Sequence, residues 1–554
     1  MHTTPQSRID QFTSQGLWGT ETLHGLLAKQ AASHPDKLAV ADQPNRMELT
    51  GEPPRRLSFS ELDAASDTLA AALHARGIGI GDKVMAQLPN ISELVICYYA
   101  LSKLGAIISP VPVQYGSHEL LSLAEALAPD ALISITQFRG NALADQAATA
   151  LHDIPILAFG RELSLQPDSV DTTARETLAQ VRQELGEDAN RIITVCWTSG
   201  TTGTPKGVPR SHNMWMATAR TSANAGDYRE GERLLNPFPL VNMAAVGGFL
   251  YASAMLGCAL VLHHPLDPPL FLKQMQDEKI NFTIAPPALL NQLAKSPDMW
   301  HQFDFSALRA VGSGSAPLSP DMIATIEGDY GIPVINYYGS NEGISLFSTP
   351  ETAATPEVRA TMFPRFGVAG MPFSGITQET VRSKVIDPDS GEDITSPGTP
   401  GELCFAGATV FDGYLGDSGE DVFTADGFFR TGDLVEICGE PPHYYRIVGR
   451  CKDIINRGGM KISPSEIDTL LEGMPELAEA AVCAYPDDHL GEKICACVVP
   501  APGKPAPSLE AICAYLQGHG IARFKLPERV EVMAALPRNP MNKVMRNALQ
   551  EAVA

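Results

Sequence analysis

Short apolar runs alternate with longer stretches of helical apolar spacing over the first part of the chain. Lys83–Gln87 and Ala131–Ile135 have the length and composition of buried strands, whereas residues 92–105 form a strongly apolar helical stretch with Gly105 as its stop signal. Strands that alternate with helices in this way predict parallel sheets covered by helices. The expected fold class is therefore α/β.

The pattern changes in the second part of the chain. From about residue 370 to residue 449 the strands become shorter and are broken by Gly, Pro and Asp, which is typical of a small β-rich subdomain. From about residue 450 an α+β pattern begins with a helix over residues 463–471. We expect a large N-terminal domain, 1–449, that contains the β-rich subdomain, and a small C-terminal domain, 450–554.

Length and composition are those of an ordinary globular protein. With 554 residues the chain is too long for a single core, and about three or four domains or subdomains are expected. A net charge of −23 argues against binding of nucleic acid, because the phosphate backbone would be repelled. The stretch 244–262 carries no charge, but Gly257 divides it into a helix and a short strand, so no membrane span is expected.

The cysteines and the N-terminus indicate the compartment. The ten cysteines form no C-x-x-C pair of metal spacing, which indicates reduced, structural thiols. The first residues lack the apolar core of a signal peptide. A cytoplasmic protein is expected.

The most informative stretch is residues 194–207, which read T-V-C-W-T-S-G-T-T-G-T-P-K-G. An apolar strand, residues 192–197, runs into a loop of Gly, Ser and Thr that ends at Lys206. Glycine amides, hydroxyl groups and one lysine together suit a polyphosphate. A polar run alone would suggest an ordinary surface loop, but its length and its position after a strand favour a phosphate cradle. Because Gly207 follows the lysine in place of Ser or Thr, this is not the P-loop motif.

Two further small-residue loops follow predicted strands, at residues 312–317 and 338–342. In open α/β sheets, ligands bind where loops gather at the carboxyl ends of the strands. Together with the loop after residue 197, they predict one nucleotide site built from three strand ends.

Six motifs, in order, carry a resemblance to a known family. They are T-S-G-T-T-G-T-P-K-G (198–207), G-S-A-P-L (314–318), Y-G-S-N-E (338–342), R-T-G-D (430–433), G-R-C-K-D-I-I-N-R-G-G-M-K (449–461) and P-R-N-P-M-N-K (537–543). Nearly the whole chain thereby resembles the adenylate-forming superfamily of acyl-CoA synthetases, aryl-acid ligases and firefly luciferase. Parts of it look particularly like 2,3-dihydroxybenzoate–AMP ligases and alicyclic-acid CoA ligases.

The resemblance implies roles for individual residues. Thr198 and Lys206 would hold the β and γ phosphates of ATP, and Glu342 would bind Mg²⁺. Lys543 would contact the carboxylate and the α-phosphate during adenylation. The implied ATP-binding residues are Ser199, Gly200, Thr201, Thr202, Gly203, Gly314, Ser315, Ala316, Pro317, Asn336, Tyr338, Gly339, Ser340, Asn341, Asp433 and Arg450. Taken singly, such residues are also common as turn residues, helix-start acids and surface cations.

The acid and the thiol would bind elsewhere in the same scheme. The implied acyl pocket consists of Asn242, Met243, Val246 and Gly247. The implied hinge and thiol tunnel consist of Lys452, Gly458, Gly459 and Lys461. In the family the small C-terminal domain is mobile and rotates about this hinge after adenylation. The two glycines also fit a simple hairpin turn, and one segment can serve both purposes.

Three positions depart from the family pattern. Asn341 stands where the family has Thr, so an amide would replace a hydroxyl near the α-phosphate. Asn542 replaces the usual Gly before the catalytic lysine; Asn tolerates left-handed backbone, so the turn can persist. Asn242 stands where many relatives have His, and Met243 points toward an apolar acid rather than a catechol acid.

The expected function is that of an ATP-dependent acid–thiol ligase that adenylates a carboxylic acid and transfers the acyl group to CoA. The alternatives are an aryl-acid ligase that loads the phosphopantetheine of a carrier protein, and a non-catalytic AMP-binding protein. The expected cofactors are ATP, Mg²⁺ and CoA or carrier phosphopantetheine. The partner is a small carboxylic acid, without nucleic acid or a membrane span. The identity of the acid, the pathway and the oligomeric state stay open.

Overall fold

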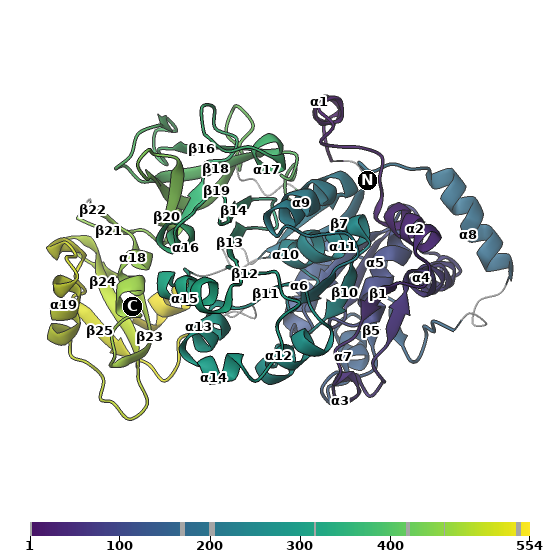
Figure 1. Cartoon of the computed structure of the whole chain (residues 1–554), viewed down its shortest axis with the longest axis horizontal. Coiled ribbons are helices and arrows are strands. Elements are labelled where there is room, and N and C mark those ends of the chain that lie inside the picture. The colour runs from purple at the N-terminus through teal and green to yellow at the C-terminus, as the bar shows by residue number, and fades with distance from the viewer. Residues whose placement is uncertain are drawn as a thin grey trace. The chain divides into compact units, whose positions relative to one another are not determined.

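The computed structural model describes residues 3–166, 172–198, 205–314, 317–416, 422–458, 460–538 and 544–553, without the side chains of residues 172–175 and 461 (Figure 1). The chain folds into two compact units. The first comprises Met1–Arg382 and Phe405–Phe429, and the second comprises Ser383–Cys404 and Arg430–Ala554. The predicted domain boundary at residue 450 lies inside the second unit and stays a prediction.

The first unit contains a six-stranded sheet in the order β6-β5-β3-β4-β7-β8. Its strands are β3 (Lys83–Gln87), β4 (Ile107–Val111), β5 (Ala131–Ile135), β6 (Ile156–Phe159), β7 (Ile192–Thr198) and β8 (Lys206–Ser211). Neighbouring strands are parallel except for β7 and β8, which are antiparallel. Its covering helices are α4 (Phe59–His74), α5 (Ser92–Leu104), α6 (Ser117–Leu127) and α7 (Leu143–Ala150). Along β3, Val84 packs with α4 and α5, and Met85 packs with α6 and α7 on the opposite face.

A second sheet of the same unit has eight strands in the order β14-β13-β12-β11-β9-β10-β1-β2. They are β1 (Leu38–Ala41), β2 (Arg56–Ser58), β9 (Arg233–Asn236), β10 (Ala259–Leu262), β11 (Phe282–Ile284), β12 (Ala310–Gly314), β13 (Val334–Gly339) and β14 (Ser345–Ser348). Only the end pairs, β1–β2 and β13–β14, are antiparallel among the pairs that the structure describes in this sheet. The predicted parallel α/β architecture is confirmed.

One hydrophobic core joins the two sheets. It combines side chains of α4 and α5 and of the first sheet with Leu234 and Leu260 of the second, and it includes Trp215 and Phe249 from the helices that follow β8 and β9. These helices are α9 (His212–Ala225), α10 (Met243–Ala245), a π-helix (Val246–Tyr251) and α11 (Ala252–Leu256). The other face of the second sheet is covered by α12 (Pro268–Asp277), α13 (Pro287–Lys295) and α15 (Pro320–Tyr330). The helices from α9 to α11 therefore pack against both sheets, which share this one core.

Several predicted elements agree residue for residue with the structure. The strands Lys83–Gln87 and Ala131–Ile135 are confirmed, and α5 ends at Gly105, which has φ 66°. The uncharged stretch 244–262 forms helix up to Leu256 and then strand β10, with a left-handed Gly257 between them. None of the helices in the described ranges is both long and apolar enough to cross a bilayer.

The first unit is completed by peripheral elements: α1 (Gln6–Ser14), α2 (Leu23–Ser33), α3 (Arg46–Thr50), α8 (Thr172–Leu185), α14 (Pro297–Trp300), β15 (Met362–Pro364), α16 (Pro356–Thr361) and α17 (Ile376–Thr380). The N-terminal cap of α4 lies at Ser58. The capping box is formed by Ser58 and Glu61, whereas the Oγ of Ser60 donates to the carbonyl of Pro35.

The second unit contains the predicted short strands. They are β16 (Val381–Ile386), β17 (Asp393–Ile394), β18 (Gly401–Gly407), β19 (Phe429–Cys438) and β20 (Tyr444–Arg450), and the end residues of β16, β18 and β19 belong to the first unit. These strands follow one another in the order β17-β16-β18-β19-β20 within a six-stranded sheet. A further sheet consists of β21 (Ile455–Arg457), β22 (Met460–Ile462), β23 (Leu477–Asp487), β24 (Gly491–Pro500) and β25 (Arg529–Val532). The helices are α18 (Pro464–Leu471), α19 (Leu509–Gly518) and α20 (Arg546–Val553).

Side chains of β23 and β24 alternate between two small cores. Val482 and Ile494 pack with α18 and α19, whereas Cys483, Cys495 and Cys497 pack with Leu549 and other residues near α20. All ten cysteines of the chain are free thiols. The α+β pattern predicted for the C-terminal residues is confirmed.

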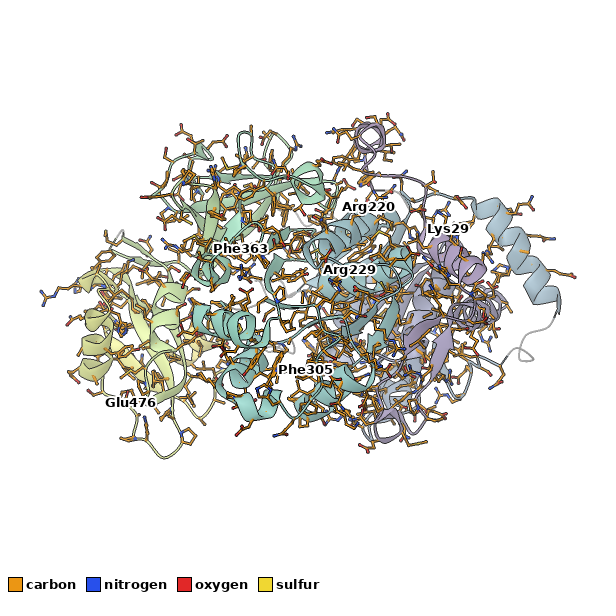
Figure 2. All side chains as sticks on the ribbon, in the orientation of Figure 1. Lys29, Arg220, Arg229, Phe305, Phe363 and Glu476 are labelled. Carbon is orange, nitrogen blue, oxygen red and sulfur yellow. The ribbon has the colours of Figure 1, made fainter. Side chains whose placement is uncertain are left out.

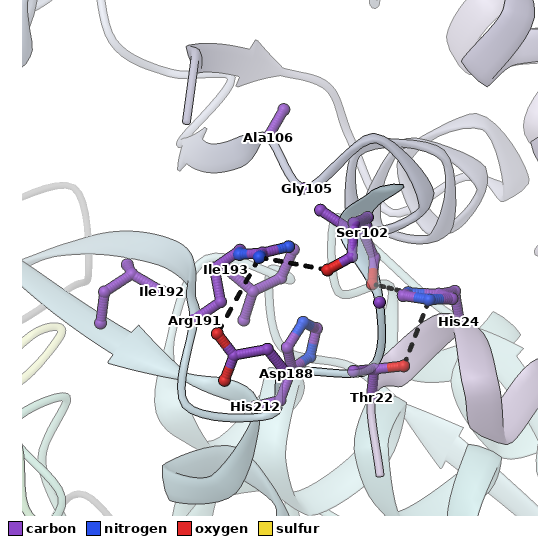
Figure 3. Close-up of a pocket in the computed structure, with 12 residues that line it drawn as sticks. Thr22, His24, Ser102, Gly105, Ala106, Asp188, Arg191, Ile192, Ile193 and His212 are labelled. Carbon is purple, nitrogen blue, oxygen red and sulfur yellow. Dashed lines mark hydrogen bonds and ion pairs between the residues drawn. The ribbon is translucent and has the colours of Figure 1, made fainter. Parts of the chain in front are cut away.

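A polar cluster with a cavity of about 10 Å³ lies at the starts of α2, β7 and α9 and the end of α5 (Figure 3). In it, His24 Nδ1 lies 2.8 Å from Ser102 Oγ, and His24 Nε2 lies 3.3 Å from Thr22 Oγ1. Such a volume holds about one water molecule and no organic substrate. Burial, followed by the cations Arg182, Lys103 and Arg191, lowers the pKa of His24 from 6.5 to about 3.

We predict that the folded chain loses stability as the pH falls from about 6.5 toward 3. An unfolded His24 takes up its proton near pH 6.5, whereas the folded one does not until about pH 3, so acid favours the unfolded chain by up to about 1.4 kcal/mol per pH unit. Melting temperatures of wild type and His24→Gln between pH 7.5 and 5 check this, with a flatter dependence expected for the variant. The exposed His118 provides the control variant, His118→Gln; equal slopes for both variants would contradict the prediction.

Candidate active site

The predicted phosphate loop lies between the antiparallel strands β7 and β8. Thr198 at the end of β7 and Lys206 at the start of β8 are register partners, so the two strands form a hairpin, the phosphate hairpin, with the predicted loop between them. Residues 199–204 lie outside the described ranges, and with them the predicted Ser199, Gly200, Thr201, Thr202 and Gly203. A strand, not a helix, follows the lysine, in keeping with the difference from the P-loop motif.

Tyr414 joins two of the predicted catalytic residues. Its hydroxyl donates to Glu342 Oε1 at 2.9 Å, and its ring centroid lies 5.0 Å from the Nζ of Lys206. The Glu342 side chain is buried, with 8% of the residue exposed. Lys206 and Glu342 therefore both contact Tyr414, the first at its ring and the second at its hydroxyl. Sequence reasoning missed Tyr414, because a single tyrosine after Gly413 matches none of the motifs considered.

Asn341 connects three separate stretches of the first unit. Its Nδ2 donates to the carbonyl of Trp197 on β7 at 3.0 Å, and its Oδ1 accepts from the backbone N–H of Met243 at 2.8 Å. The carboxyl end of β7 belongs to the six-stranded sheet, whereas Asn341 follows β13 of the eight-stranded sheet. The predicted loops therefore come from two sheets rather than one, and this amide joins them. The oxygen and one N–H of the amide are used within the protein, which leaves one N–H for a ligand.

Arg210 on β8 fixes the backbone behind these side chains. It is fully buried, and its guanidinium donates to the carbonyls of Asn341 at 3.0 Å and Thr409 at 2.8 Å, and to Thr218 Oγ1 at 2.8 Å. Its Cζ lies 4.1 Å from the ring centroid of Trp215. Burial lowers the pKa of Arg210 to about 10, with Cys196 and Glu342 among the groups that oppose the shift, so the cation persists at neutral pH.

The residues predicted for the acyl pocket lie at the start of the helices after β9. Asn242 caps α10, because its Oδ1 accepts from the N–H of Ala245 at 3.1 Å. Met243 Sδ lies 4.0 Å from Ser345 Oγ. Met243 also reaches the predicted nucleotide loop, since a Cβ on Gly339 would lie 2.6 Å from its Cε.

The other two predicted pocket residues lie in the π-helix. Val246 is fully buried in the core shared by the two sheets. Gly247 faces α9, where an added Cβ would lie 2.5 Å from Thr218 Cγ2. These contacts are those of helix packing, and a contact of either residue with an acid stays a prediction.

The remaining described nucleotide positions lie on β12 and β13 and the loops after them. Asn336 is buried and donates to the carbonyls of Arg359 and Ala360, both at 3.0 Å. The ring of Tyr338 lies 5.6 Å from that of Phe363, the second of which is labelled in Figure 2. Three further predicted residues complete this part. They are Gly314, where a Cβ would lie 2.2 Å from the Tyr337 carbonyl; Ser340, whose buried Oγ has no partner within the described residues; and Pro317, which is exposed.

The second unit carries the predicted ribose and hinge residues. Arg450 Nε donates to Asp433 Oδ1 at 2.6 Å, and the two residues are register partners on β20 and β19. Lys452 lies in the 3₁₀ turn Cys451–Asp453, and Gly458, with φ 58°, turns the hairpin between β21 and β22. The hairpin predicted for this segment is confirmed. Four further predicted site residues lie outside the described ranges: Ser315, Ala316, Gly459 and Lys543. For Lys461 only the backbone, on β22, is described.

We predict different responses to alanine at two adjacent glycines of the π-helix. Gly247→Ala would drive a methyl group into Thr218, whose hydroxyl is bonded to Arg210, and overpacking of this kind costs about 1–3 kcal/mol. Gly248→Ala is the matched control, because its nearest contact would be Ser222 Oγ at an ordinary 3.8 Å. Thermal unfolding should show a melting temperature lowered by several degrees for the first variant only; equal melting temperatures would contradict this account of the packing.

Comparisons with known proteins agree with this arrangement. The family described as AMP-binding enzyme matches residues 27–415, and the AMP-binding enzyme C-terminal domain matches residues 466–543. A 2-hydroxy-7-methoxy-5-methyl-1-naphthoate–CoA ligase of Streptomyces carzinostaticus is 30% identical over 566 residues, covering 99% of this chain and 96% of that protein. Enterobactin synthase component E of Escherichia coli (strain K12) is 29% identical over 562 residues, covering 99% of this chain and 98% of that protein.

Solved structures show the same fold. The crystal structure of ATP-bound MatB from Rhodopseudomonas palustris superposes with a TM-score of 0.75 at 25% identity, covering 96% of this chain and 98% of that one. The match of sequence, order of motifs and fold extends over both units. The chain therefore belongs to the AMP-binding enzyme family, the adenylate-forming acid ligases.

Proposed function

We propose that this protein is an AMP-forming acid–thiol ligase that transfers the activated acyl group to CoA. The observation that carries the proposal is the contact of Lys206 and Glu342 with Tyr414, beside the strand ends that flank the predicted phosphate loop. A cation for the phosphates and a carboxylate for a metal are what an attack of one anion on another requires.

The residues present fit ATP with Mg²⁺. Magnesium is usually held by one or two carboxylates together with substrate phosphates, and the carboxylate of Glu342 is an oxygen donor of this kind. When bound, the metal would neutralise developing charge on the phosphates. Lys206 and Thr198 would orient the β and γ phosphates. In the second unit, Arg450 holds the carboxylate of Asp433, which would accept hydrogen bonds from the ribose hydroxyls.

The proposed reaction has two steps. An oxygen of the acid attacks the α-phosphorus of ATP, the bond to the β-phosphate oxygen breaks, and pyrophosphate leaves with that electron pair. The sulfur of the thiol then attacks the acyl carbonyl, loses its proton to the surroundings, and AMP leaves. We assign Lys543 to the first step, as the cation that contacts both the carboxylate and the α-phosphate. We assign Lys452 as the hinge, and Gly458, Gly459 and Lys461 as the approach of the thiol.

The acid is proposed to be apolar, aryl or alicyclic. Met243 lies against Gly339 and Ser345 beside the predicted nucleotide loop and packs on the shared hydrophobic core. Asn242, the neighbouring polar side chain, is engaged as a helix cap. An apolar side chain in this place favours an acid without ionised groups beyond its carboxylate.

The second candidate is transfer to the phosphopantetheine of a carrier protein. It is supported by the end-to-end similarity to enterobactin synthase component E, at 98% of that protein's length. The naphthoate–CoA ligase, matched over 96% of that protein's length, supports CoA. The two candidates share the first step and differ only in the thiol.

Pyrophosphate release with a panel of benzoates, cyclic acids and short to medium fatty acids tests the proposal. We expect release with one class of apolar acid and, after CoA is added, a thioester of the same acid. Adenylate without CoA turnover would favour the carrier protein. Lack of pyrophosphate release across the panel, with ATP still bound, would favour a non-catalytic AMP-binding protein.

For the enzyme with its best acid, we predict that Glu342→Gln lowers kcat/KM by about 100-fold. The change removes the negative charge and keeps the shape of the side chain. Pyrophosphate release measured over a range of Mg²⁺ concentrations checks this, with Glu351→Gln, an exposed acid after β14, as the control. A Glu342 variant with wild-type kinetics would exclude this residue as the metal ligand.

A further inference from the structure

The N-terminal residues 3–20 form an arm that lies outside the part of the chain matched by the family. The arm contains α1, and its apolar side chains Phe12, Leu17 and Trp18 pack against α9 and against Ala408. Arg220 of α9 (Figure 2) donates to the carbonyl of Leu17 at 3.0 Å. A segment so well packed and hydrogen-bonded is a defined part of the structure rather than a loose terminus.

Arg8 of the arm is bound to one short stretch, residues 407–415, which we call the bridging loop. Its guanidinium donates to the carbonyls of Gly407 at 2.9 Å and Phe411 at 3.2 Å, to the carbonyl of Val410, and to the carboxylate of Asp412. The Asp412 side chain is only 5% exposed. Trp18 Nε1 adds a hydrogen bond to the carbonyl of Ala408 at 3.1 Å. One arginine thus fixes four groups of the loop, in a geometry that a lysine does not reproduce.

The opposite side of the bridging loop contacts both halves of the candidate site. At the acid, the N–H of Phe411 donates to the carbonyl of Glu342 at 2.9 Å, and Thr409 Oγ1 donates to the carbonyl of Gly343 at 2.7 Å. At the phosphate hairpin, the N–H of Leu415 donates to the carbonyl of Gly207 at 2.8 Å.

Between these backbone contacts, Tyr414 of the bridging loop touches the side chains of Glu342 and Lys206 themselves. The loop therefore sets the distance between the two charged groups. Any shift of the loop moves both of them relative to each other. The sequence separation of about 400 residues between the arm and the loop hides this connection from inspection of motifs.

We propose that Tyr414 and Arg8 are positioning residues for magnesium-bound ATP: Tyr414 aligns Glu342 with Lys206, and Arg8 acts through the bridging loop to hold Tyr414 in place. The inference rests on the proposed function, because it assigns Glu342 to the metal and Lys206 to the phosphates. It extends the site to a segment that lies outside residues 27–415, the range matched by the AMP-binding enzyme family model.

The test measures the Mg²⁺ concentration for half-maximal rate and the KM for ATP in Tyr414→Phe and Arg8→Met. We expect each variant to raise both constants about 3- to 10-fold, the effect of one lost hydrogen bond or of a few weakened ones. The KM for the acid should stay within about 2-fold of wild type, since neither residue contacts the acyl region. Tyr330→Phe and Gln11→Ala are the controls: the first removes a hydroxyl with a 3.4 Å bond elsewhere in the first unit, and the second changes an exposed residue of α1.

The double variant Arg8→Met/Tyr414→Phe tests whether the arm acts through the loop. If it does, the shift in the Mg²⁺ constant is smaller than the product of the single shifts. Independent effects that multiply would overturn the role of Arg8. If Arg8→Met does not fold, Arg8→Lys serves in its place, because it retains the charge but lacks the several N–H donors of the guanidinium. An intermediate shift of the Mg²⁺ constant and of the KM for ATP is then expected.

Calorimetric titration of each protein with MgATP, without any acid, separates the two proposals. Wild type that does not bind MgATP would overturn both the function and the inference. Wild type that binds MgATP, together with Tyr414→Phe and Arg8→Lys variants that bind it equally well, would overturn the inference alone. Lower melting temperatures with unchanged Mg²⁺ and ATP constants would assign both residues to stability only.

Discussion

The structure around the site depends on one buried cation, Arg210. Its guanidinium has no access to water, and its two terminal nitrogens donate to acceptors from α9, from Asn341 and from Thr409, whereas Nε has no partner among the described residues. These stretches are far apart in sequence, and all of them are bound by the same charged group. The loss of one acceptor would leave a buried charge partly unpaired, which costs more than the bond itself contributes. Arg210 thus fixes the loop that carries Glu342 relative to the bridging loop.

The site also depends on the helical layer that two sheets share. Since β7 and β8 belong to one sheet and β13 belongs to the other, Lys206 and Glu342 can be aligned only if both sheets pack on the same core. The amide of Asn341 is the direct link between them. The asparagine side chain donates to a carbonyl through its nitrogen and accepts from an N–H through its oxygen. A threonine is shorter and would have to make both hydrogen bonds through one hydroxyl group. The departure from the family pattern therefore has a structural use in this chain.

Much of the fold was predictable from the sequence, because apolar runs and glycine stops are local signals. Lys83–Gln87 and the end of α5 at Gly105 are examples. The site was predictable where motifs identify residue types, as for Lys206 and Glu342, but motifs do not separate ligand contacts from packing. Asn336 and Asn242 make backbone hydrogen bonds, and Gly247 faces a helix. Tyr414 and Arg8 had no local signal at all, since their partners are brought near only by the tertiary fold.

The π-helix Val246–Tyr251 has a consequence for how substrates are assigned to such enzymes. A π turn contains one residue more than an α turn, so every side chain after Val246 is rotated relative to a relative that has a plain helix there. If specificity positions are carried over from such a relative to this chain by sequence alone, each position after the π turn is displaced by one residue. Specificity positions that are counted from the end of β9 lose their register at this turn, and superposing the backbones restores it.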